Sequence, residues 1–150
     1  MSFWDASALV PLLLRQRASV AARTLYRRSP DVVVWWGTAV ECESAIARLE
    51  RAGELTPHET ADARKRLSEA EAGWTEVEPS RAVRSTARRL LRVHDLRAGD
   101  ALQLAAALAW TEDRGSGEGF VSLDVRLSDA ARREGFRVLP ADPAGAVHER

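Results

Sequence analysis

Several features that would each point to a class of protein are missing from this sequence. It has one cysteine, Cys42, which excludes an internal disulfide framework and suits a reducing compartment. It has no net charge, because 22 Lys and Arg residues balance 22 Asp and Glu residues. The simplest sign of a nucleic-acid-binding chain, a strongly basic composition, is therefore absent, although a local basic stripe is not excluded. Lys65 is the only lysine, so nearly all positive charge is arginine, the side chain best shaped to bind phosphate.

Long hydrophobic runs are missing as well. The two longest, residues 8–14 and 101–110, are well short of the ~20 residues that a membrane-spanning helix needs. The start of the chain does not resemble a secretion signal, since Asp5 precedes the first apolar stretch and no Lys or Arg comes before Arg15. We therefore expect a cytoplasmic protein with no membrane partner.

What the sequence does contain is the composition of a globular chain. Of its 150 residues, 45% are hydrophobic and 29% are charged. A chain of this length buries roughly 68–70% of the surface that it exposes when unfolded, which is enough for a hydrophobic core. No repeat or linker interrupts it, so we expect one domain over residues 1–150.

Strand patterns alternate with helix patterns along the whole chain. The predicted strands are 2–4, 32–35, 74–77, 120–123 and 136–139. The predicted helices are 6–14, 19–28, 38–51, 56–72, 80–93, 98–110 and 125–134, with a loop at 115–119. This alternation predicts an α/β fold with a mainly parallel sheet.

Four carboxylates fall at the same kind of junction in this pattern. Asp5 and Asp124 follow predicted strands at the turn into a helix, Glu41 lies in the first turn of the helix after the second strand, and Asp100 begins an apolar helix. The carboxyl ends of parallel strands share one edge of a sheet, where ligands usually bind. Four acids at one edge would repel one another unless a cation held them, and hard oxygen ligands suit Mg²⁺ or Mn²⁺.

The same acids have a simpler interpretation. Aspartate is a preferred helix N-cap, so Asp5, Asp100 and Asp124 could each cap a helix, and Thr38 with Glu41 matches a capping box. Spacing alone leaves capping and metal binding both open.

Ordered sequence blocks carry a family resemblance. They are FWDASALV at 3–10, TAVECESAIAR at 38–48, LRAGDALQLAAA at 96–107, FVSLDVRL at 120–127 and GFRVL at 135–139. In order, spacing and total length, this set resembles the PIN-domain ribonucleases, and most of all the VapC toxins of bacterial type II toxin–antitoxin pairs. The likeness spans essentially the whole chain.

The resemblance implies a three-layer α/β/α sandwich and a metal-dependent endoribonuclease. Carried over position by position, the catalytic and metal-binding acids would be Asp5, Glu41, Asp100 and Asp124. Together they would hold one or two Mg²⁺ (or Mn²⁺) ions, which lower the pKa of a bound water for hydrolysis of an RNA phosphodiester bond. The expected products carry 3′-hydroxyl and 5′-phosphate ends. The implied partners are an RNA substrate, a cognate antitoxin that blocks the acidic pocket, and a second copy of the chain in a homodimer.

Three neighbours of these acids need separate predictions. Ser7 and Ser122 match positions where the family often has a small hydroxyl near the metal, although helix capping or a turn explains them more simply. Glu43 is a second acid close to Glu41, and we expect it near the opposite side of the helix, away from the pocket.

Arginines give the clearest candidates for RNA binding. Arg84, Arg88 and Arg92 recur on one face of the helix at 80–93, with Arg97 close by, and Val83, Ala87, Leu90 and Leu91 are expected on the core face. This arginine face is either a solvated surface or a track for RNA phosphates, which would make binding salt-dependent.

Other candidates are weaker. Either Trp35 or Trp36 could stack on a base, with the other facing the core. The three histidines, His58, His94 and His148, are scattered, show no zinc spacing and are expected at the surface. The helical hairpin over 38–72 and the segment 12–14 are candidate dimer or antitoxin surfaces.

Two alternative functions follow from the residues. A binding or scaffold protein would use the acids only as caps, and would not bind Mn²⁺ in a way that depends on Asp5 and Asp124. A phosphatase with an aspartyl nucleophile needs a second acid two residues after the first, where this chain has Ser7.

Overall fold

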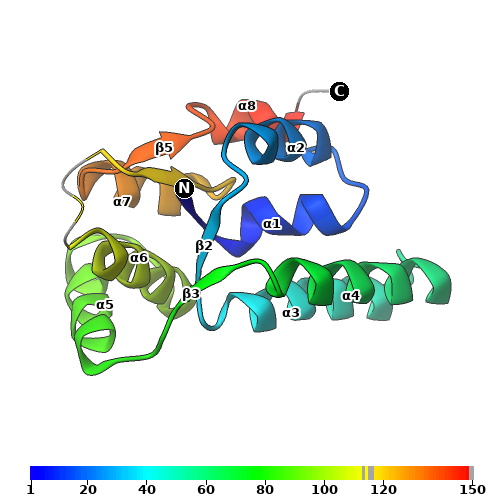
Figure 1. Cartoon of the computed structure of the whole chain (residues 1–150), viewed down its shortest axis with the longest axis horizontal. Helices are drawn as coiled ribbons and strands as arrows, with labels where there is room; N and C mark the ends of the chain where they lie inside the picture. Colours follow the sequence, from blue (N-terminus) through cyan, green and yellow to red (C-terminus); the bar gives the residue numbers. More distant parts are fainter. Residues whose placement is uncertain (113, 115–116, 149–150) are drawn as a thin grey trace.

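The computed structural model describes residues 1–112, 114 and 117–148, and forms them into an α/β fold (Figure 1). The strands are β1 (Ser2–Trp4), β2 (Val32–Trp35), β3 (Thr75–Val77), β4 (Gly119–Val121) and β5 (Arg137–Leu139). The helices are α1 (Ala6–Leu13), α2 (Ser19–Arg28), α3 (Thr38–Arg51), α4 (Pro57–Glu71), α5 (Arg81–Val93), α6 (Ala98–Thr111), α7 (Val125–Arg133) and α8 (Pro143–His148).

The strands form one sheet in the order β3-β2-β1-β4-β5, and all of its described pairs are parallel. The chain builds the sheet outward from β1 to β3, then returns to place β4 on the other side of β1. The junction between β1 and β4 is therefore the topological switch point, where the chain leaves adjacent strands in opposite directions and opens a crevice at their carboxyl ends.

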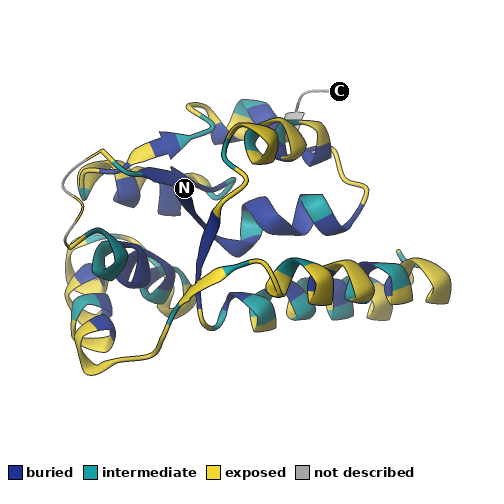
Figure 2. Ribbon diagram, in the orientation of Figure 1, coloured by how far each residue is buried: buried dark blue, intermediate teal, exposed yellow. Residues whose placement is uncertain are grey.

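Helices cover both faces of the sheet because successive strand residues point to opposite sides. Phe3, Val33 and Phe120 belong to a core shared with α5, α6 and α7. Trp4 and Val34 belong to a second core shared with α1, α3 and α4. Figure 2 shows the central strands β1, β2 and β4 and the inward helix faces as buried, and the edge strand β3 and the outer helix faces as largely exposed. The result is the three-layer α/β/α sandwich that the sequence predicts.

Helices α3 and α4 form a hairpin that projects from the body of the molecule (Figure 1). Gly53 allows the turn after α3 because its φ of 73° lies in the left-handed region, which disfavours other residues. Thr56 then starts α4 with a capping box, in which its hydroxyl accepts from the Glu59 amide and the Glu59 carboxylate accepts from the Thr56 amide. Local sequence signals thus define both ends of the turn.

The structure departs from the sequence-based predictions at a few places. Thr38 lies inside α3 and makes no capping box with Glu41, because the helix begins after Gly37 and both side chains bond to Gln103 instead. Leu91 is 42% exposed and lies outside the core, one position past the buried stripe of α5.

Other differences concern His94 and the end of the chain. His94 is not a surface residue, since its side chain is only 9% exposed and its Nε2 lies 2.9 Å from Glu134. The helix α8 was not predicted. Of the predicted loop at 115–119, residues 115 and 116 lie outside the described residues. None of the helices in the described part of the chain is long and apolar enough to cross a membrane.

Candidate active site

A cavity of about 960 Å³ opens at the carboxyl edge of the sheet, and all four predicted acids line it. Asp5 follows β1 and Asp124 follows the segment after β4, so these two come from the switch point itself. Glu41 comes from the first turn of α3 and Asp100 from the first turn of α6. A fifth carboxylate, Asp95, also lines the cavity and lies 3.6 Å from Arg126. We call this cavity the acidic pocket.

Asp5 is the most buried of the four acids, at 4% exposure. It is the N-cap of α1, and its carboxylate accepts from the Ser7 amide at 3.2 Å and from the Ser7 hydroxyl at 2.8 Å. Burial raises the pKa of Asp5 to about 7, with a further contribution from the charge of Asp124, while the hydrogen bonds from Ser7 and Ser122 oppose the shift. Asp5 therefore does cap α1, but its buried carboxylate has no arginine or lysine partner among the described residues.

Asp124 is also an N-cap, and hydrogen bonds of Ser7 and Ser122 connect it to Asp5. Its Oδ1 accepts from the Leu127 amide at 2.8 Å, which starts α7. The Ser7 hydroxyl accepts from the Leu123 amide at 2.8 Å, and the Ser122 hydroxyl accepts from the Asp124 amide at 3.1 Å. Ser122 thus has the predicted turn role, whereas the Ser7 hydroxyl connects α1 to the turn after β4.

Glu41 and Asp100 form the other side of the acidic pocket. Glu41 accepts a 3.0 Å hydrogen bond from the Gln103 amide, and burial together with the charge of Asp100 raises its pKa. Burial and the charge of Asp124 raise the pKa of Asp100, against the lowering effect of the Arg97 backbone and side chain. Asp100 lies in the third position of α6 and not at its N-cap, which is Arg97. The charge of Asp124 thus raises the pKa of both Asp5 and Asp100, and the charge of Asp100 raises that of Glu41.

No arginine or lysine forms an ion pair with these four carboxylates within the described residues. The acidic pocket therefore offers hard oxygen ligands that no described arginine or lysine pairs with directly, which fits a divalent cation such as Mg²⁺ or Mn²⁺. The side chains do not converge on one point, since no three His, Cys, Asp or Glu groups among the described residues stand close enough together to hold an ion. The residue types, rather than their present spacing, fit a metal.

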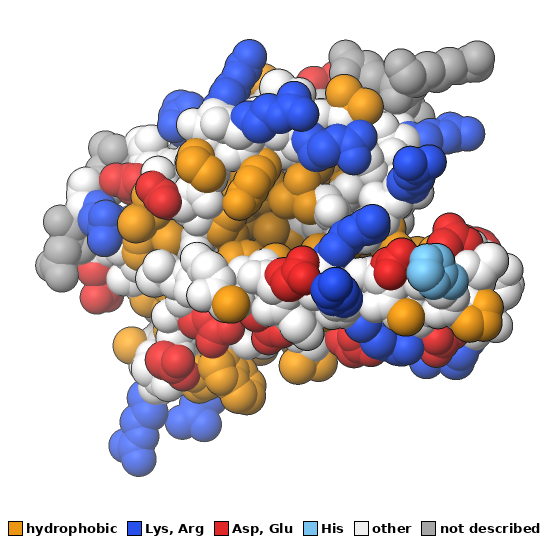
Figure 3. All heavy atoms as spheres, turned by 45° about the vertical axis from the view of Figure 1, so that its right-hand side comes forward, with side chains coloured by type: hydrophobic (Ala, Val, Ile, Leu, Met, Phe, Trp, Pro, Cys, Tyr) orange, Lys and Arg blue, Asp and Glu red, His pale blue; other side chains and the backbone are white. Residues whose placement is uncertain are grey.

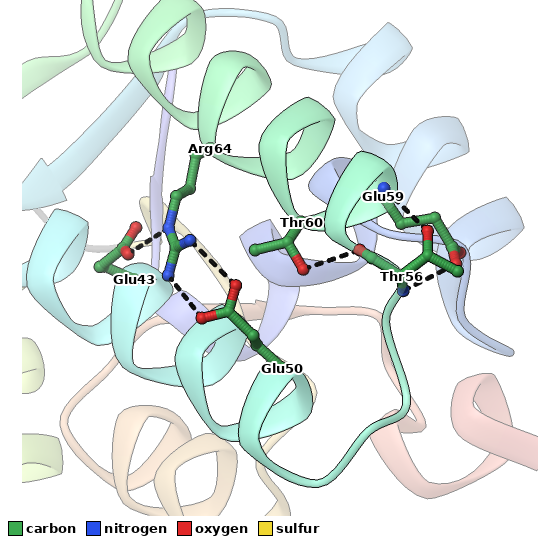
Figure 4. A network of polar contacts seen from close by, with 6 residues as sticks. All are labelled: Glu43, Glu50, Thr56, Glu59, Thr60 and Arg64. Atoms are coloured by element: carbon green, nitrogen blue, oxygen red, sulfur yellow. Dashed lines mark hydrogen bonds and ion pairs between the residues drawn. The ribbon is translucent and has the colours of Figure 1, made fainter.

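Glu43 shows the contrast on the same helix. Its carboxylate accepts a 2.7 Å hydrogen bond from Nε of Arg64 on α4, and Glu50 accepts from the same guanidinium (Figure 4). The prediction that Glu43 faces away from Glu41 is confirmed. Glu43 joins the two helices of the hairpin, while Glu41 faces the acidic pocket.

The predicted arginines are divided between two regions. Arg97 lines the acidic pocket. Arg84 lines a separate hollow beside Trp35, and Arg88 and Arg92 are exposed on α5. Of the adjacent tryptophans, Trp35 is buried and Trp36 is 52% exposed.

Sequence reasoning missed two further arginines that line the acidic pocket, Arg48 and Arg126. Helical spacing could have found the first, since Arg48 follows Glu41 by seven residues and two turns of a helix return to the same face. Arg126 follows Asp124 by two residues at the start of α7, where no periodic pattern marks it.

Cys42 offers no nucleophile next to this site. Its thiol is buried, and burial together with the charge of Glu41 raises its pKa to about 12. A thiol with such a pKa stays protonated near neutral pH, where it is a poor nucleophile.

A second, apolar hollow of about 380 Å³ lies between α1, α2 and α4. Figure 3 shows hydrophobic side chains at its base and arginines around its rim, beside the projecting hairpin. Its lining residues include Leu12, Leu13, Tyr26, Arg66 and Trp74. It contains part of the segment 12–14 that the sequence marks as a partner surface.

Comparison with known proteins agrees with this architecture. The PIN domain family model matches residues 3–142, so the chain belongs to the PIN-domain family. Within that family it is of the VapC type: it is 34% identical over 139 residues to Ribonuclease VapC45 and to Ribonuclease VapC49, from two strains of Mycobacterium tuberculosis, covering 93% of this chain and 94% of each relative. Its fold also matches a chain of a toxin-antitoxin complex from Klebsiella pneumoniae, with a TM-score of 0.62 and 17% identity over 91% of this chain and 96% of that one.

Proposed function

We propose that this protein is a Mg²⁺- or Mn²⁺-dependent endoribonuclease that acts as the toxin of a toxin–antitoxin pair. The observation that carries the proposal is the acidic pocket, in which four carboxylates from four elements share one cavity and none has a cationic partner among the described residues. The ribonuclease names of its two relatives support the reaction. Helix capping alone does not account for the arrangement, because burying the Asp5 carboxylate without a cationic partner among the described residues costs stability.

Asp5, Glu41, Asp100 and Asp124 would hold the metal as direct or water-mediated ligands. When bound, the metal supplies an activated water and stabilises charge on the phosphate and the leaving oxygen. Asp5 and Asp124 are fixed at the ends of α1 and α7 by their own capping bonds, so they provide the rigid side of the site. The Glu41 side chain has one hydrogen-bond partner among the described residues, Gln103. It would orient the attacking water or contribute to a second ion.

Positive charge near the acidic pocket would bind the RNA backbone. Arg48, Arg97 and Arg126 line the cavity, and we assign them the phosphates next to the cleaved bond. Arg84, Arg88 and Arg92 would bind phosphates farther along the strand, from the exposed face of α5.

Protein partners would bind elsewhere. An antitoxin is the expected occupant of the apolar hollow between α1, α2 and α4, with a basic side chain that reaches the acidic pocket and neutralises it. That the matched fold comes from a toxin-antitoxin complex supports this partner. We further propose one nuclease domain over residues 1–150 that acts as a homodimer in the cytoplasm.

The test is a map of new RNA 5′-phosphate ends in bacteria after induced expression, comparing the wild type with Asp5→Asn. We expect discrete new ends with the wild type alone, and those ends also identify the RNA target. Purified protein with Mn²⁺ and a fluorophore–quencher RNA pool of random sequence provides the test outside the cell. If the purified wild type cuts the pool no faster than Asp5→Asn, the proposed function is wrong and the scaffold alternative takes its place.

A further inference from the structure

We propose that Gln103, together with Thr38, is a positioning residue that holds Glu41 at the acidic pocket and sets its separation from Asp100. The inference rests on the proposed function, since it explains how the acidic pocket keeps its shape. It is carried by a fully buried polar group from α6 that bonds to the Glu41 side chain across 62 positions of the chain.

The contacts form two tiers between α3 and α6. Thr38 and Glu41 are three residues apart on α3, and Asp100 and Gln103 are three residues apart on α6, so each pair stacks along one face of its helix. Thr38 and Gln103, both 0% exposed, meet in the inner tier. Glu41 and Asp100 occupy the outer tier and line the acidic pocket. The contact between Thr38 and Gln103 would therefore set the distance between Glu41 and Asp100.

The inner tier is saturated with hydrogen bonds. The Thr38 hydroxyl donates to Gln103 Oε1 at 3.3 Å and accepts from Gln103 Nε2 at 3.0 Å. The Thr38 hydroxyl can donate and accept, so this pair fits either orientation of the amide. The remaining N–H of Gln103 Nε2 donates to Glu41 Oε2 at 3.0 Å, and because an ionised carboxylate can only accept, Glu41 determines which end of the amide carries nitrogen.

The other carboxylate oxygen of Glu41, Oε1, has no hydrogen-bond partner among the described residues and can face the acidic pocket. Oε1 lies next to the start of α6, where a side chain added at Gly99 would place its Cβ 3.6 Å from it. Gln103 thus binds Oε2 of Glu41 and, by fixing the carboxylate, orients Oε1. An amide suits this role because it is neutral and binds the carboxylate without cancelling the charge that would attract a cation.

A role in packing alone predicts a different result from a role in positioning. If the polar pair served only the core, replacing both partners by apolar side chains of similar shape would be nearly neutral, since no buried group is left unpaired in the core. If it positions Glu41, the same replacement leaves the fold intact and impairs the acidic pocket. The double variant Thr38→Val/Gln103→Leu separates the two.

We expect this double variant to melt close to the wild type but to cleave the random RNA pool about 10- to 100-fold more slowly in Mn²⁺, the range typical of residues that orient metal ligands. Its dissociation constant for Mn²⁺, measured by titration calorimetry without RNA, should rise as well. In a Glu41→Ala background the same two substitutions should have almost no further effect on cleavage, because Gln103 acts through Glu41.

Two single substitutions provide a test that does not depend on the double variant. Thr38→Ser keeps the hydroxyl and should retain cleavage, whereas Thr38→Val keeps the size, frees the amide and should lose it. Thr60→Val is the matched control, since Thr60 is a buried threonine on α4 whose hydroxyl donates to the Thr56 carbonyl at 3.0 Å. It should lower stability and leave cleavage unchanged.

The inference is overturned if Thr38→Val and the double variant cleave and bind Mn²⁺ like the wild type, or if the double variant loses as much activity in the Glu41→Ala background as alone. Both results require that the wild type cleaves and that Asp5→Asn does not. If the wild type itself does not cleave, the proposed function fails first.

Discussion

The glutamates on the two sides of helix α3 differ in their partners. On one side, Glu43 and Glu50 share the guanidinium of Arg64 and join the hairpin helices (Figure 4). On the other, Glu41 shares the acidic pocket with Asp5, Asp100 and Asp124, and among the described residues its side chain bonds only to the neutral amide of Gln103. The residue type and the helix are the same, so the difference lies in the partners. Glu43 and Glu50, which have an arginine partner, connect the two helices of the hairpin, whereas Glu41, which has none among the described residues, lines the candidate site.

The largest expected effect comes from removing the most buried unpaired charge. A pKa of about 7 means that folding raises the proton affinity of Asp5 above its ordinary value of 3.8. The protein without metal is therefore stabilised by protonation of Asp5 below pH ~4, and loses that stability as pH rises through 7. In EDTA at pH 8, Asp5→Asn should raise the free energy of unfolding, by at most roughly 4 kcal/mol.

Chemical denaturation at several pH values measures this effect. The advantage of Asp5→Asn should shrink steadily from pH 8 to pH 4, where the wild-type carboxyl is neutral as well. A variant less stable than the wild type at pH 8 would mean that the capping role of Asp5 outweighs its burial.

Substitutions at Glu41 and Glu43 test whether the two sides of α3 differ in function. Glu41→Gln should slow RNA cleavage by on the order of a hundredfold or more, since losing a metal ligand costs at least as much as losing the residue that orients it. Glu43→Gln, two residues away, should cleave like the wild type. Initial rates on the random RNA pool, at matched protein concentration, distinguish them, and equal losses in both variants would remove the distinction between the two sides of α3.

Arginines next to the acidic pocket should matter more than those on α5. Charge reversal of Arg48 and Arg126 should weaken RNA binding about tenfold or more and reduce the salt dependence of the affinity, because each lost phosphate contact lowers the slope by about one. Reversal of Arg84 and Arg88 should have a smaller effect on both. Fluorescence anisotropy with Asp5→Asn protein, which should bind without cutting, measures affinity at several salt concentrations. Unchanged affinity and slope after reversal of Arg84 and Arg88 would remove the α5 face from the RNA path.

The smallest effect is expected at the paired side of α3. Arg64→Gln removes both ion pairs of the hairpin, whose members are all about two-fifths exposed. Exposed ion pairs contribute little, so the melting temperature should fall only slightly and cleavage should persist. A scanning calorimetry trace beside a cleavage assay checks this, and a large loss of activity would show that the hairpin supports the acidic pocket.

Local sequence patterns made most of this fold predictable, but they did not predict the tertiary contacts. Asp5 and Asp124 could be placed from sequence because a short apolar run followed by an acid and a helix pattern is a local signal. The helix at Pro143–His148 was missed because six residues with Pro, Gly and two Ala carry no apolar period. Gln103 gave no sign of its role, since it sits in an apolar helix and its partners are more than 60 positions away. Thr38 was mistaken for a cap because its sequence matches a capping box, which its bond to Gln103 replaces.

The most direct test of the central claim is a calorimetric titration of Mn²⁺ into the wild type, the double variant Asp5→Asn/Asp124→Asn, and Glu43→Gln. The account predicts saturable binding to the wild type and to Glu43→Gln, and none to the double variant when all three are folded. Equal binding to all three, or binding to none, would contradict it, because the unpaired acids would then be helix caps and nothing more.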